Sequence, residues 1–256
     1  MNRMKEPDKH SAWTFAAEIR DRIKTGIYPA GYRLPPIRRL AEDEGVGRGI
    51  VETALGRLRA EGLLEARRGS GTFVRAGRIL RVSPSRLSAK QWGQGKSIQS
   101  HDAPDPPQAV DVRVGDVLPS LDVAYALGVE PGVVVLSRYR RFVKDGRSVQ
   151  LATSYLPTEL TRGTRIEHTD TGPGGTYQRL AEQGWKPTRF TEQIIGRAPT
   201  PGEISGVDDL DGLGLRREGA MVFEITRHAF AGDRCVEVTR MVLDAGAYEL
   251  IYNFSS

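Results

Sequence analysis

Arginines and glycines are concentrated between residues 34 and 75, and their types suit contact with a DNA duplex. An arginine presents a fork of donors that matches the O6 and N7 atoms of guanine or the oxygens of a phosphate. Glycines let a hairpin turn tightly and approach a nucleic acid closely. Solvated surface arginines, and glycines needed only for a turn, would show the same residue types. The candidate contacts are Arg38, Arg48, Thr53, Arg57, Arg67, Arg68, Gly69 and Gly71.

Short helices and a hairpin must position these residues, and the apolar periodicity predicts both. Residues 11–25, 36–44 and 48–61 each repeat apolar side chains at helical spacing. Gly45-Val46-Gly47 is expected to form the turn between the second and third helices. Residues 63–75 predict a strand, a tight turn and a second strand. Such a unit can place one helix in the major groove while its hairpin flanks the duplex.

The excess positive charge of the chain lies in this N-terminal part. Residues 1–78 contain 16 Lys and Arg against 10 Asp and Glu, whereas residues 79–256 contain 21 against 22. A basic unit attached to a nearly neutral one favours phosphate contact by the first unit alone. At 256 residues, the chain is long enough for two domains with separate cores.

Two arginines of the second half have the spacing of an anion site. Arg138 and Arg140 are two residues apart on a predicted strand, so they point to the same face of its sheet. Their like charges repel unless an anion or an acidic side chain lies between them, and both alternatives stay open. Arg141 is expected on the opposite, solvated face. The Gly-rich loop 171–177 precedes a helix, whose free N–H groups either hold an anion or serve only the entry into the helix.

The rest of the chain predicts an α+β domain, because consecutive antiparallel strands are interrupted by a few helices. Strands are expected at residues 111–118, 131–143, 148–156, 189–198, 221–230, 235–244 and 248–254. Helices are expected at residues 119–129 and within 171–184.

Composition argues against several classes of protein. No apolar run is long enough for a membrane span, and the first residues lack the apolar core of a signal peptide, so a cytoplasmic protein is expected. The single cysteine, Cys235, allows no intrachain disulfide, and four scattered histidines give no metal-ligand spacing. No nucleophile and base form a recognised catalytic arrangement, so neither an enzyme nor a cofactor is expected.

Residues 11–75 resemble the winged helix-turn-helix domain of the GntR family of bacterial transcription regulators. The resemblance rests on Leu34-Pro35 before Arg38, Val46-x-Arg48, Val51, Ala54-Leu55, Leu58, Glu61-Gly62-Leu63 and Gly69-x-Gly71-Thr72-Phe73-Val74. In that family the arginines that match Arg38 and Arg48 touch DNA. The chain departs from the family pattern at Gly47, Gly49, Ile50 and Glu52, so the operator sequence is not transferable from relatives.

Residues from about 80 to the end resemble the UTRA effector domain of the HutC-type branch of that family. Residues 137–157 and 174–184, two late hairpin strands and a Tyr-rich end carry this resemblance. It implies an effector held through its phosphate or carboxylate by Arg138 and Arg140. The other candidate effector contacts are Ser154, Gly175, Thr176 and Tyr177. The expected fold is therefore α+β, with a winged helix-turn-helix domain at residues 1–76, a linker at 77–90 and a mainly antiparallel UTRA-like domain at 91–256.

One departure bears on the ligand. Sugar-phosphate sensors of this branch commonly carry a glutamate at the position of Ala152, where it grips hydroxyl groups. A pocket without that acceptor is less suited to amino sugars. Glu224 or Glu237 is a possible substitute, but strand parity alone does not decide which of them points inward.

The resulting hypothesis is a transcription repressor that binds an inverted-repeat operator in double-stranded DNA as a homodimer. A small effector of unknown identity, with an anion as the leading expectation, would control it. One alternative is a constitutive DNA-binding protein whose second domain only dimerises or recruits another protein. Another is an enzyme, because the UTRA fold resembles chorismate lyase. A small anion that raises thermal stability would favour the sensor over the recruiting protein.

Overall fold

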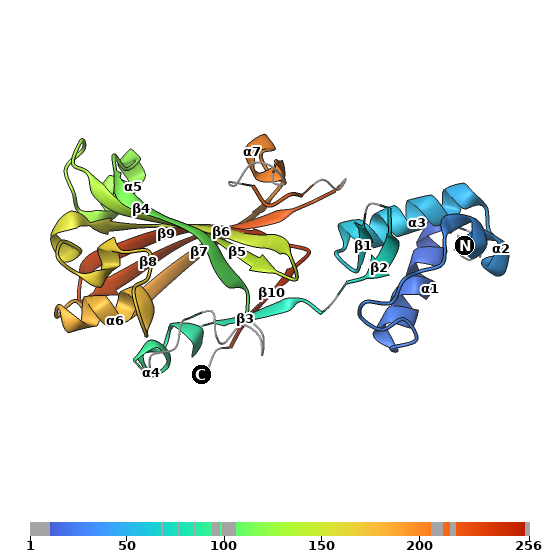
Figure 1. Ribbon diagram of the computed structural model, residues 1–256, viewed down its shortest axis with the longest axis horizontal. Coiled ribbons are helices and arrows are strands. Elements are labelled where there is room, and N and C mark those ends of the chain that lie inside the picture. The colour runs from blue at the N-terminus through green and yellow to red at the C-terminus, as the bar shows by residue number, and fades with distance from the viewer. Residues whose placement is uncertain are drawn as a thin grey trace, which may run out of the picture. The chain divides into compact units, whose positions relative to one another are not determined.

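The computed structural model describes residues 11–253, except residues 68, 76, 84, 94–97, 99–105, 206–211 and 216–218. The chain divides into two compact units, which we call the head and the body (Figure 1). The head extends to Arg78 and also includes Gly219 and Ala220, whereas the body begins at Ile79. Within the described ranges, no helix is long and apolar enough to cross a membrane.

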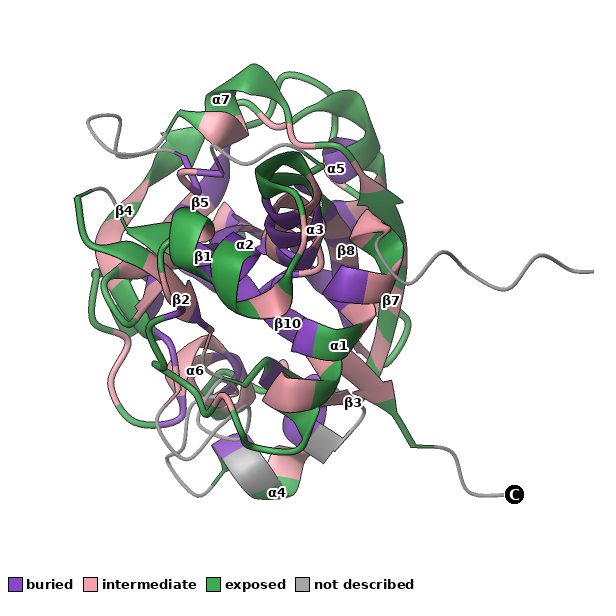
Figure 2. Cartoon of the chain, turned by 90° about the vertical axis from the view of Figure 1, so that its right-hand side faces the viewer, coloured by how far each residue is buried: buried purple, intermediate pink, exposed green. Residues whose placement is uncertain are grey.

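Three helices build the core of the head. They are α1 (Ala12–Lys24), α2 (Ile37–Glu44) and α3 (Arg48–Ala60). Ser11 caps α1, because its side-chain oxygen accepts a hydrogen bond from the Thr14 N–H group at 3.1 Å. The apolar faces predicted from the sequence meet in one buried cluster, and α3 consequently has a buried side and an exposed side (Figure 2). The buried members of this cluster include Phe15, Ile19, Leu40, Val51, Leu55 and Leu58.

A two-stranded wing follows α3. Its strands β1 (Leu64–Arg67) and β2 (Gly71–Val74) pair in antiparallel fashion. Leu64 and Val74 face each other across this pair and are buried in the helical cluster, which anchors the wing to the head. The head therefore contains the helices and the hairpin that the sequence predicts.

A six-stranded antiparallel sheet forms the centre of the body. Its strands are β4 (Gln108–Val117), β5 (Val135–Lys144), β6 (Arg147–Pro157), β7 (Arg189–Arg197), β8 (Val222–Ala231) and β9 (Arg234–Asp244). Their spatial order is β4-β5-β6-β9-β8-β7. Strand β6 therefore pairs with β9 and not with β7, which follows it in the sequence.

Different elements cover the two faces of this sheet. Helices α4 (Ala89–Trp92) and α6 (Gly175–Glu182) pack against one face, which we call the inner face. Helix α5 (Leu121–Leu127) packs against the opposite face. The body also contains α7 (Pro201–Ile204) and short 3-10 turns at Ser85–Leu87, Thr158–Leu160 and Arg165–Glu167.

A further strand lies inside the segment expected to be a linker. Strand β3 (Ile79–Ser83) pairs in parallel with β10 (Tyr248–Tyr252) near the other end of the described chain. Its first, third and fifth residues are buried, as in a half-buried strand. The expected linker at 77–90 therefore includes elements of the body. Local sequence does not reveal this strand because its only partner is distant along the chain.

Replacement of two glycines of the head by alanine should change the stability of the head in opposite directions. Gly49 lies inside α3, and an added Cβ would meet no atom within 4 Å. Gly45 ends α2 in the left-handed region, with a φ of 65°. We predict that Gly49→Ala raises the free energy of unfolding by about 0.5–1 kcal/mol, because alanine loses less backbone entropy than glycine. Gly45→Ala should lower it by about 1 kcal/mol, because a Cβ is strained at positive φ.

Urea unfolding followed by circular dichroism measures both variants against the parent chain. Shifts of the same sign for the two variants would contradict the backbone conformations described here.

Candidate functional site

The exposed side of α3 carries the first predicted DNA contacts. Arg48 is the first residue of the helix and is exposed. Glu52 and Thr53 follow one turn later and are also exposed. The Thr53 hydroxyl donates to the Gly49 carbonyl at 2.8 Å, so only its oxygen lone pairs remain for a ligand. Arg48 occupies the position from which recognition helices reach base edges.

Two other predicted contacts have partners within the head. Arg38 Nε donates to Glu42 Oε1 at 2.9 Å, but both side chains are more than half exposed. Such a surface pair contributes little stability, so a phosphate can replace the carboxylate at small cost. The guanidinium carbon of Arg57 lies 3.7 Å from the centre of the Trp13 ring, which fixes Arg57 against α1.

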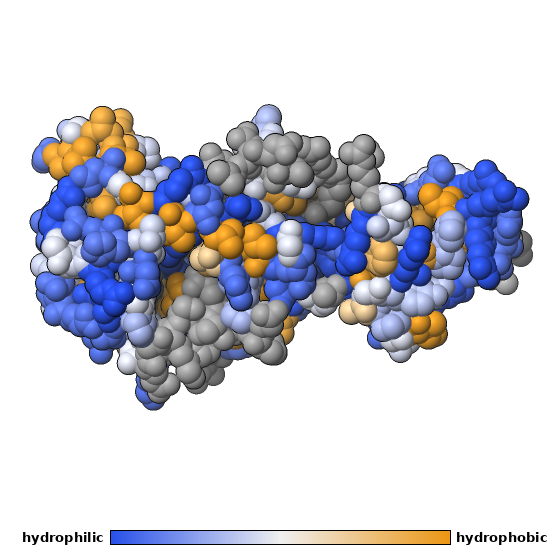
Figure 3. Space-filling view, in the orientation of Figure 1, coloured by the Kyte–Doolittle hydropathy of each residue, from blue (hydrophilic) through white to orange (hydrophobic). Residues whose placement is uncertain are grey.

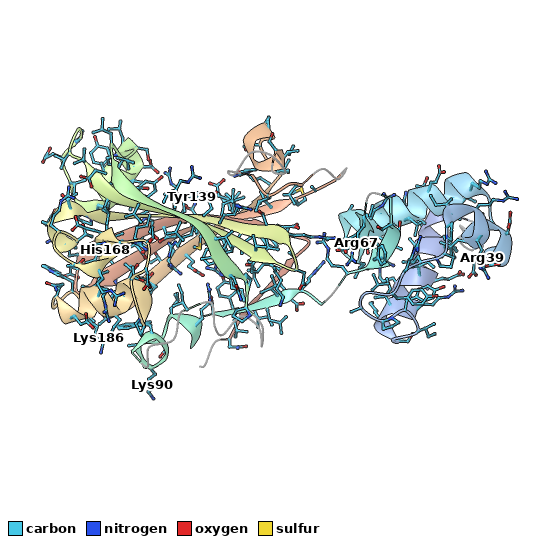
Figure 4. The ribbon with its side chains drawn as sticks, viewed as in Figure 1. Arg39, Arg67, Lys90, Tyr139, His168 and Lys186 are labelled. Carbon is cyan, nitrogen blue, oxygen red and sulfur yellow. The ribbon has the colours of Figure 1, made fainter. Side chains whose placement is uncertain are left out.

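The predicted contacts on the wing are held by different constraints, a hydrogen bond in one case and the backbone conformation in two others. Arg67, labelled in Figure 4, donates from Nε to Glu65 Oε1 at 2.7 Å. Gly69 and Gly71 have φ angles of 72° and 114°, a region that favours glycine, so the turn itself requires both. Arg68 lies outside the residues that the structure describes.

A cavity of about 430 Å³ lies in the body. It brings together five of the predicted effector-binding residues, which are Arg138, Arg140, Gly175, Thr176 and Tyr177. Thr169, Asp170, Arg227 and Glu237 also line it. The sixth predicted residue, Ser154, is not among the lining residues.

Ser154 supports Arg140 from within the sheet. Arg140 Nη2 donates to Ser154 Oγ at 2.5 Å, and Ser154 Oγ shares a 2.9 Å hydrogen bond with the Thr239 hydroxyl. Because Ser154 is fully buried, it orients Arg140 and does not reach the cavity. Burial lowers the pKa of Arg140, and the Glu237 carboxylate opposes that shift.

Arg138 holds the loop that forms one wall of the cavity. Its Nη1 group donates to the carbonyls of Ile166 and His168, and its Nη2 group donates to the Thr169 carbonyl at 3.1 Å. These backbone carbonyls take up most of its donors. Burial, aided by the charge of Arg140, lowers the pKa of Arg138 to about 10, so it remains protonated at neutral pH. These contacts indicate that Arg138 positions the loop. Arg138 also lines the cavity, so it can touch a ligand as well.

Glu237, and not Glu224, points into the cavity. Tyr177 Oη donates to Glu237 Oε2 at 2.7 Å, and Arg227 Nη2 lies 3.8 Å from the same oxygen. Glu237 lines the cavity, whereas Glu224 forms an ion pair with Arg197 at 2.5 Å. Burial raises the pKa of Tyr177 well above its usual value, so its hydroxyl is a neutral donor.

Positive charge exceeds negative charge around the cavity. The guanidinium groups of Arg138, Arg140 and Arg227 face one buried carboxylate, that of Glu237. Asp170 also lines the cavity, but its side chain is 80% exposed and pairs with an arginine of its own loop. The Nε atoms of Arg140 and Arg227 are buried and have no hydrogen-bond partner within the described residues. Because unsatisfied buried donors cost free energy, an anion that accepts from them would stabilise the body.

The polar residues of the cavity interrupt the apolar packing of the inner face. Along β5, Leu136 belongs to one apolar cluster and Phe142 to another, with the two cavity arginines between them. The same order of apolar, polar and apolar residues recurs on β6, β8 and β9, whose polar members are Ser154, Arg227 and Thr239. Ala152 lies opposite Arg140 in the register and belongs to the second cluster, so it offers no polar side-chain atom.

This row of polar side chains continues to β7 and β3. Glu192 of β7 lies opposite Arg227 in the register. Arg81 of β3 donates from Nη2 to Glu192 Oε1 at 2.5 Å, and these side chains are only 1% and 7% exposed. Burial opposes the charged form of Glu192, but Arg81 and Arg227 outweigh it and lower the pKa of this carboxyl. Buried charges of alternating sign therefore link the cavity to β3.

Sequence reasoning missed two of these residues and misplaced one. Arg227 lies on a predicted strand, but the pairing with β9 decides which of its alternating side chains faces the cavity. Arg81 lies in the segment expected to be a linker. Arg141 was expected to be solvated, and this is wrong, because it is partly buried. Its Nη1 group donates to Ser148 Oγ at 3.0 Å, and its Nε lies 3.9 Å from Asp111 Oδ2.

Two family models match the chain. The model of the bacterial regulatory proteins of the gntR family matches residues 14–74, which span the helices and wing of the head. The model of the UTRA domain matches residues 107–249, which span the sheet of the body. Both resemblances seen in the sequence are confirmed, as is the predicted fold of a winged helix-turn-helix followed by a UTRA domain.

Individual relatives agree with these matches. An uncharacterised HTH-type transcriptional regulator of Streptomyces coelicolor is 32% identical over 203 residues, which cover 73% of this chain and 74% of that protein. A second one, of Rhizobium meliloti, is 29% identical over 231 residues, which cover 86% and 90%. The crystal structure of PhnF from Mycobacterium smegmatis superposes with a TM-score of 0.55 at 25% identity, covering 94% of this chain and 99% of that one.

The environment of Cys235 predicts a thiol that reacts slowly with labelling reagents. Burial raises the pKa of Cys235 to about 11, and its sulfur lies 3.5 Å from the Glu237 carbonyl oxygen. An unperturbed thiol has a pKa of about 8.5, so at pH 8 the folded protein holds far less thiolate than the unfolded chain. We predict that DTNB at pH 8 labels the native protein on the order of a hundredfold more slowly than the urea-unfolded protein. Equal rates would show that Cys235 is accessible and ionised.

Proposed function

The chain belongs to the GntR family of bacterial regulatory proteins and contains a UTRA domain, and from this premise we propose that it is an effector-controlled repressor. It is a transcription regulator with a DNA-binding helix-turn-helix domain and an effector-binding UTRA domain. The finer parts of the proposal are repression, an inverted-repeat operator, a homodimer in the cytoplasm and an anionic effector. The observation that carries the last of these is the buried excess of guanidinium groups around the cavity.

The head supports the proposed reading of an operator. Arg48 begins α3 and is exposed, so it can donate two hydrogen bonds to one guanine in the major groove. Arg38 at the start of α2 and the wing residues Arg67 and Gly71 would contact the flanking phosphates. Glu52, exposed one turn after Arg48, would favour a cytosine, whose amino group donates to a carboxylate.

An apolar surface patch on the body supports the proposed homodimer. Leu118, Leu121 and Tyr125 lie at and just before α5, and their side chains are 68%, 60% and 69% exposed. Figure 3 shows hydrophobic atoms gathered at this end of the body. Exposed apolar patches commonly mark protein interfaces. A two-fold axis through such an interface would present two heads to the two halves of an inverted repeat.

The cavity favours a small effector that carries a carboxylate or a phosphate. The unsatisfied N–H groups of Arg140 and Arg227 are strong donors to such an anion. Glu237 would accept from a hydroxyl group of the same molecule, and Phe142 and Val112 would contact its carbon skeleton. Ala152 supplies no acceptor for the hydroxyl groups of an amino sugar, so Glu237 would have to fill that role.

Control of DNA binding requires that the effector binds two arrangements of the dimer with different affinity. We propose that the bound anion favours an arrangement in which the two heads do not span both half-sites. An operator and an effector would then weaken each other's binding by the same factor.

Operator binding should depend on the exposed Arg48 at the start of α3. Arg48→Ala should weaken binding to the operator at least about tenfold, because each lost bidentate contact to a base costs about 1–3 kcal/mol. Its oligomeric state should not change. The matched control is Arg59→Ala in the last turn of the same helix, which removes the same charge. Fluorescence anisotropy with an operator obtained by genomic DNA selection, and sedimentation of the free protein, measure the two properties. Specific binding that survives Arg48→Ala would contradict the major-groove assignment.

Effector binding should depend on Arg140, which lines the cavity. A thermal-shift panel of inorganic phosphate, succinate and glucose 6-phosphate should contain a compound that raises the melting temperature. Arg140→Met should weaken that compound's binding by about 10- to 100-fold, because a hydrogen bond to a charged group contributes about 1.5–3 kcal/mol.

Arg141→Met is the matched control for this experiment, because it removes the same charge from the opposite face of the same strand. Arg140→Met should also leave the ligand-free protein at least as stable, since it removes a desolvated charge that forms no ion pair with a carboxylate among the described residues. Equal losses of binding in both variants would contradict the proposed role of the cavity.

A further inference from the structure

The segment before α2 pairs with the wing through an isolated β-bridge. The N–H group of Gly31 donates to the Val74 carbonyl at 2.9 Å, and that of Leu34 donates to the Thr72 carbonyl at 2.8 Å. Arg33, between these two residues, forms an antiparallel bridge with Phe73 of β2. The sequence of residues 25–35, TGIYPAGYRLP, predicts only a turn region, so it does not mark Arg33 as a DNA contact.

The side chain of Arg33 lies against the wing glycine. A Cβ added to Gly71 would be 3.2 Å from Arg33 Nε and 3.8 Å from its guanidinium carbon. The missing side chain of Gly71 therefore leaves the space that this guanidinium group occupies. Phe73 is the bridge partner of Arg33, and the ring of Phe73 has Arg67 stacked on it at 4.4 Å. Arg33 and Arg67 thus flank Phe73 on the wing.

Arg33 and Arg67 differ in whether a nearby carboxylate balances their positive charge. Arg67 donates to Glu65 at 2.7 Å, and the same carboxylate lies 4.0 Å from Arg75 Nε. Arg33 is exposed, and no ion pair joins it to a carboxylate within the part of the chain that the structure describes. Of the two described arginines that flank Phe73, Arg33 is therefore the one whose charge no carboxylate balances.

We propose that Arg33 is a phosphate ligand in the DNA complex and extends the contact surface from the wing to the segment before α2. The inference rests on the proposed function only in that the head binds DNA. An exposed guanidinium group loses little hydration on approaching a phosphate, and Arg33 gives up no ion pair with any described residue to do so. Arg67 must first exchange its hydrogen bond to Glu65.

The test measures the salt dependence of DNA binding by the full chain. The probe is a mixed-sequence duplex without an inverted repeat, because a phosphate contact is independent of sequence. Arg33→Ala should bind more weakly at low salt. The slope of log K against log salt should become shallower by about 0.9 for each head that contacts the duplex, which is the contribution of one neutralised phosphate.

Two control variants distinguish the loss of a phosphate contact from a mere change in the net charge of the head. Lys24→Ala removes the same charge from the last residue of α1, outside the wing, and should leave the slope unchanged. Arg33→Lys keeps the charge and should restore most of the slope. A slope unchanged in Arg33→Ala, or reduced equally in Lys24→Ala, would overturn the assignment of Arg33. If the parent chain itself fails to bind any duplex, the proposed function fails and not this assignment alone.

Discussion

The burial of guanidinium groups in the middle of a β-sheet is the constraint on which the body depends. A buried charge is costly unless an opposite charge or sufficient hydrogen bonds accompany it. Arg138 has three backbone carbonyls as acceptors and Arg81 has Glu192, although the Nε atom of each has no hydrogen-bond partner among the described residues. Arg140 and Arg227 meet this requirement less completely, because among the described residues Glu237 is the one buried carboxylate that lines the cavity, and Arg227 leaves both Nε and Nη1 without a hydrogen-bond partner.

This constraint also explains how the core of the body is divided. A row of polar side chains crosses the inner face, and separate apolar clusters lie on its two sides. The cavity gathers four buried guanidinium nitrogens that have no partner among the described residues, on Arg138, Arg140 and Arg227. A ligand in the cavity can therefore remove part of the cost of burying these charges. An anion between Arg140 and Arg227 would supply the acceptors that the chain does not provide.

The same row offers a physical path from the cavity to the strand where the body begins. An anion bound to Arg227 would compete with Glu237 and Glu192 for one guanidinium group. Glu192 is in turn the hydrogen-bond partner of Arg81 on β3. A change in the pairing of Glu192 therefore reaches β3 through side chains that are almost fully buried and hence poorly screened. Strand β3 directly follows Arg78, the last residue of the head before the body begins.

Local periodicity predicted what depends on neighbouring residues. It predicted the three helices and the hairpin of the head, and it placed Arg138 and Arg140 on one face of a strand. It did not predict features set by distant pairing. The cavity role of Arg227 follows from the non-sequential strand order, and β3 exists only because β10 pairs with it. Arg33 was missed for the same reason, since its bridge to Phe73 crosses from a turn segment to the wing.

The two sets of arginines obey different electrostatics, and this difference separates their functions. The arginines at the starts of α2 and α3, and Arg33 beside the wing, are exposed, so dissolved salt screens them and competes for the phosphates they would bind. Of the cavity arginines, Arg138 and Arg227 are buried and Arg140 is half-buried, so screening there is weak and each hydrogen bond to an anion is stronger. Binding of DNA by the head should therefore weaken steeply as ionic strength rises, whereas binding of an anion in the body should weaken much less. A rise in salt would thus shift the balance between operator and effector toward the effector without any change in the concentration of either.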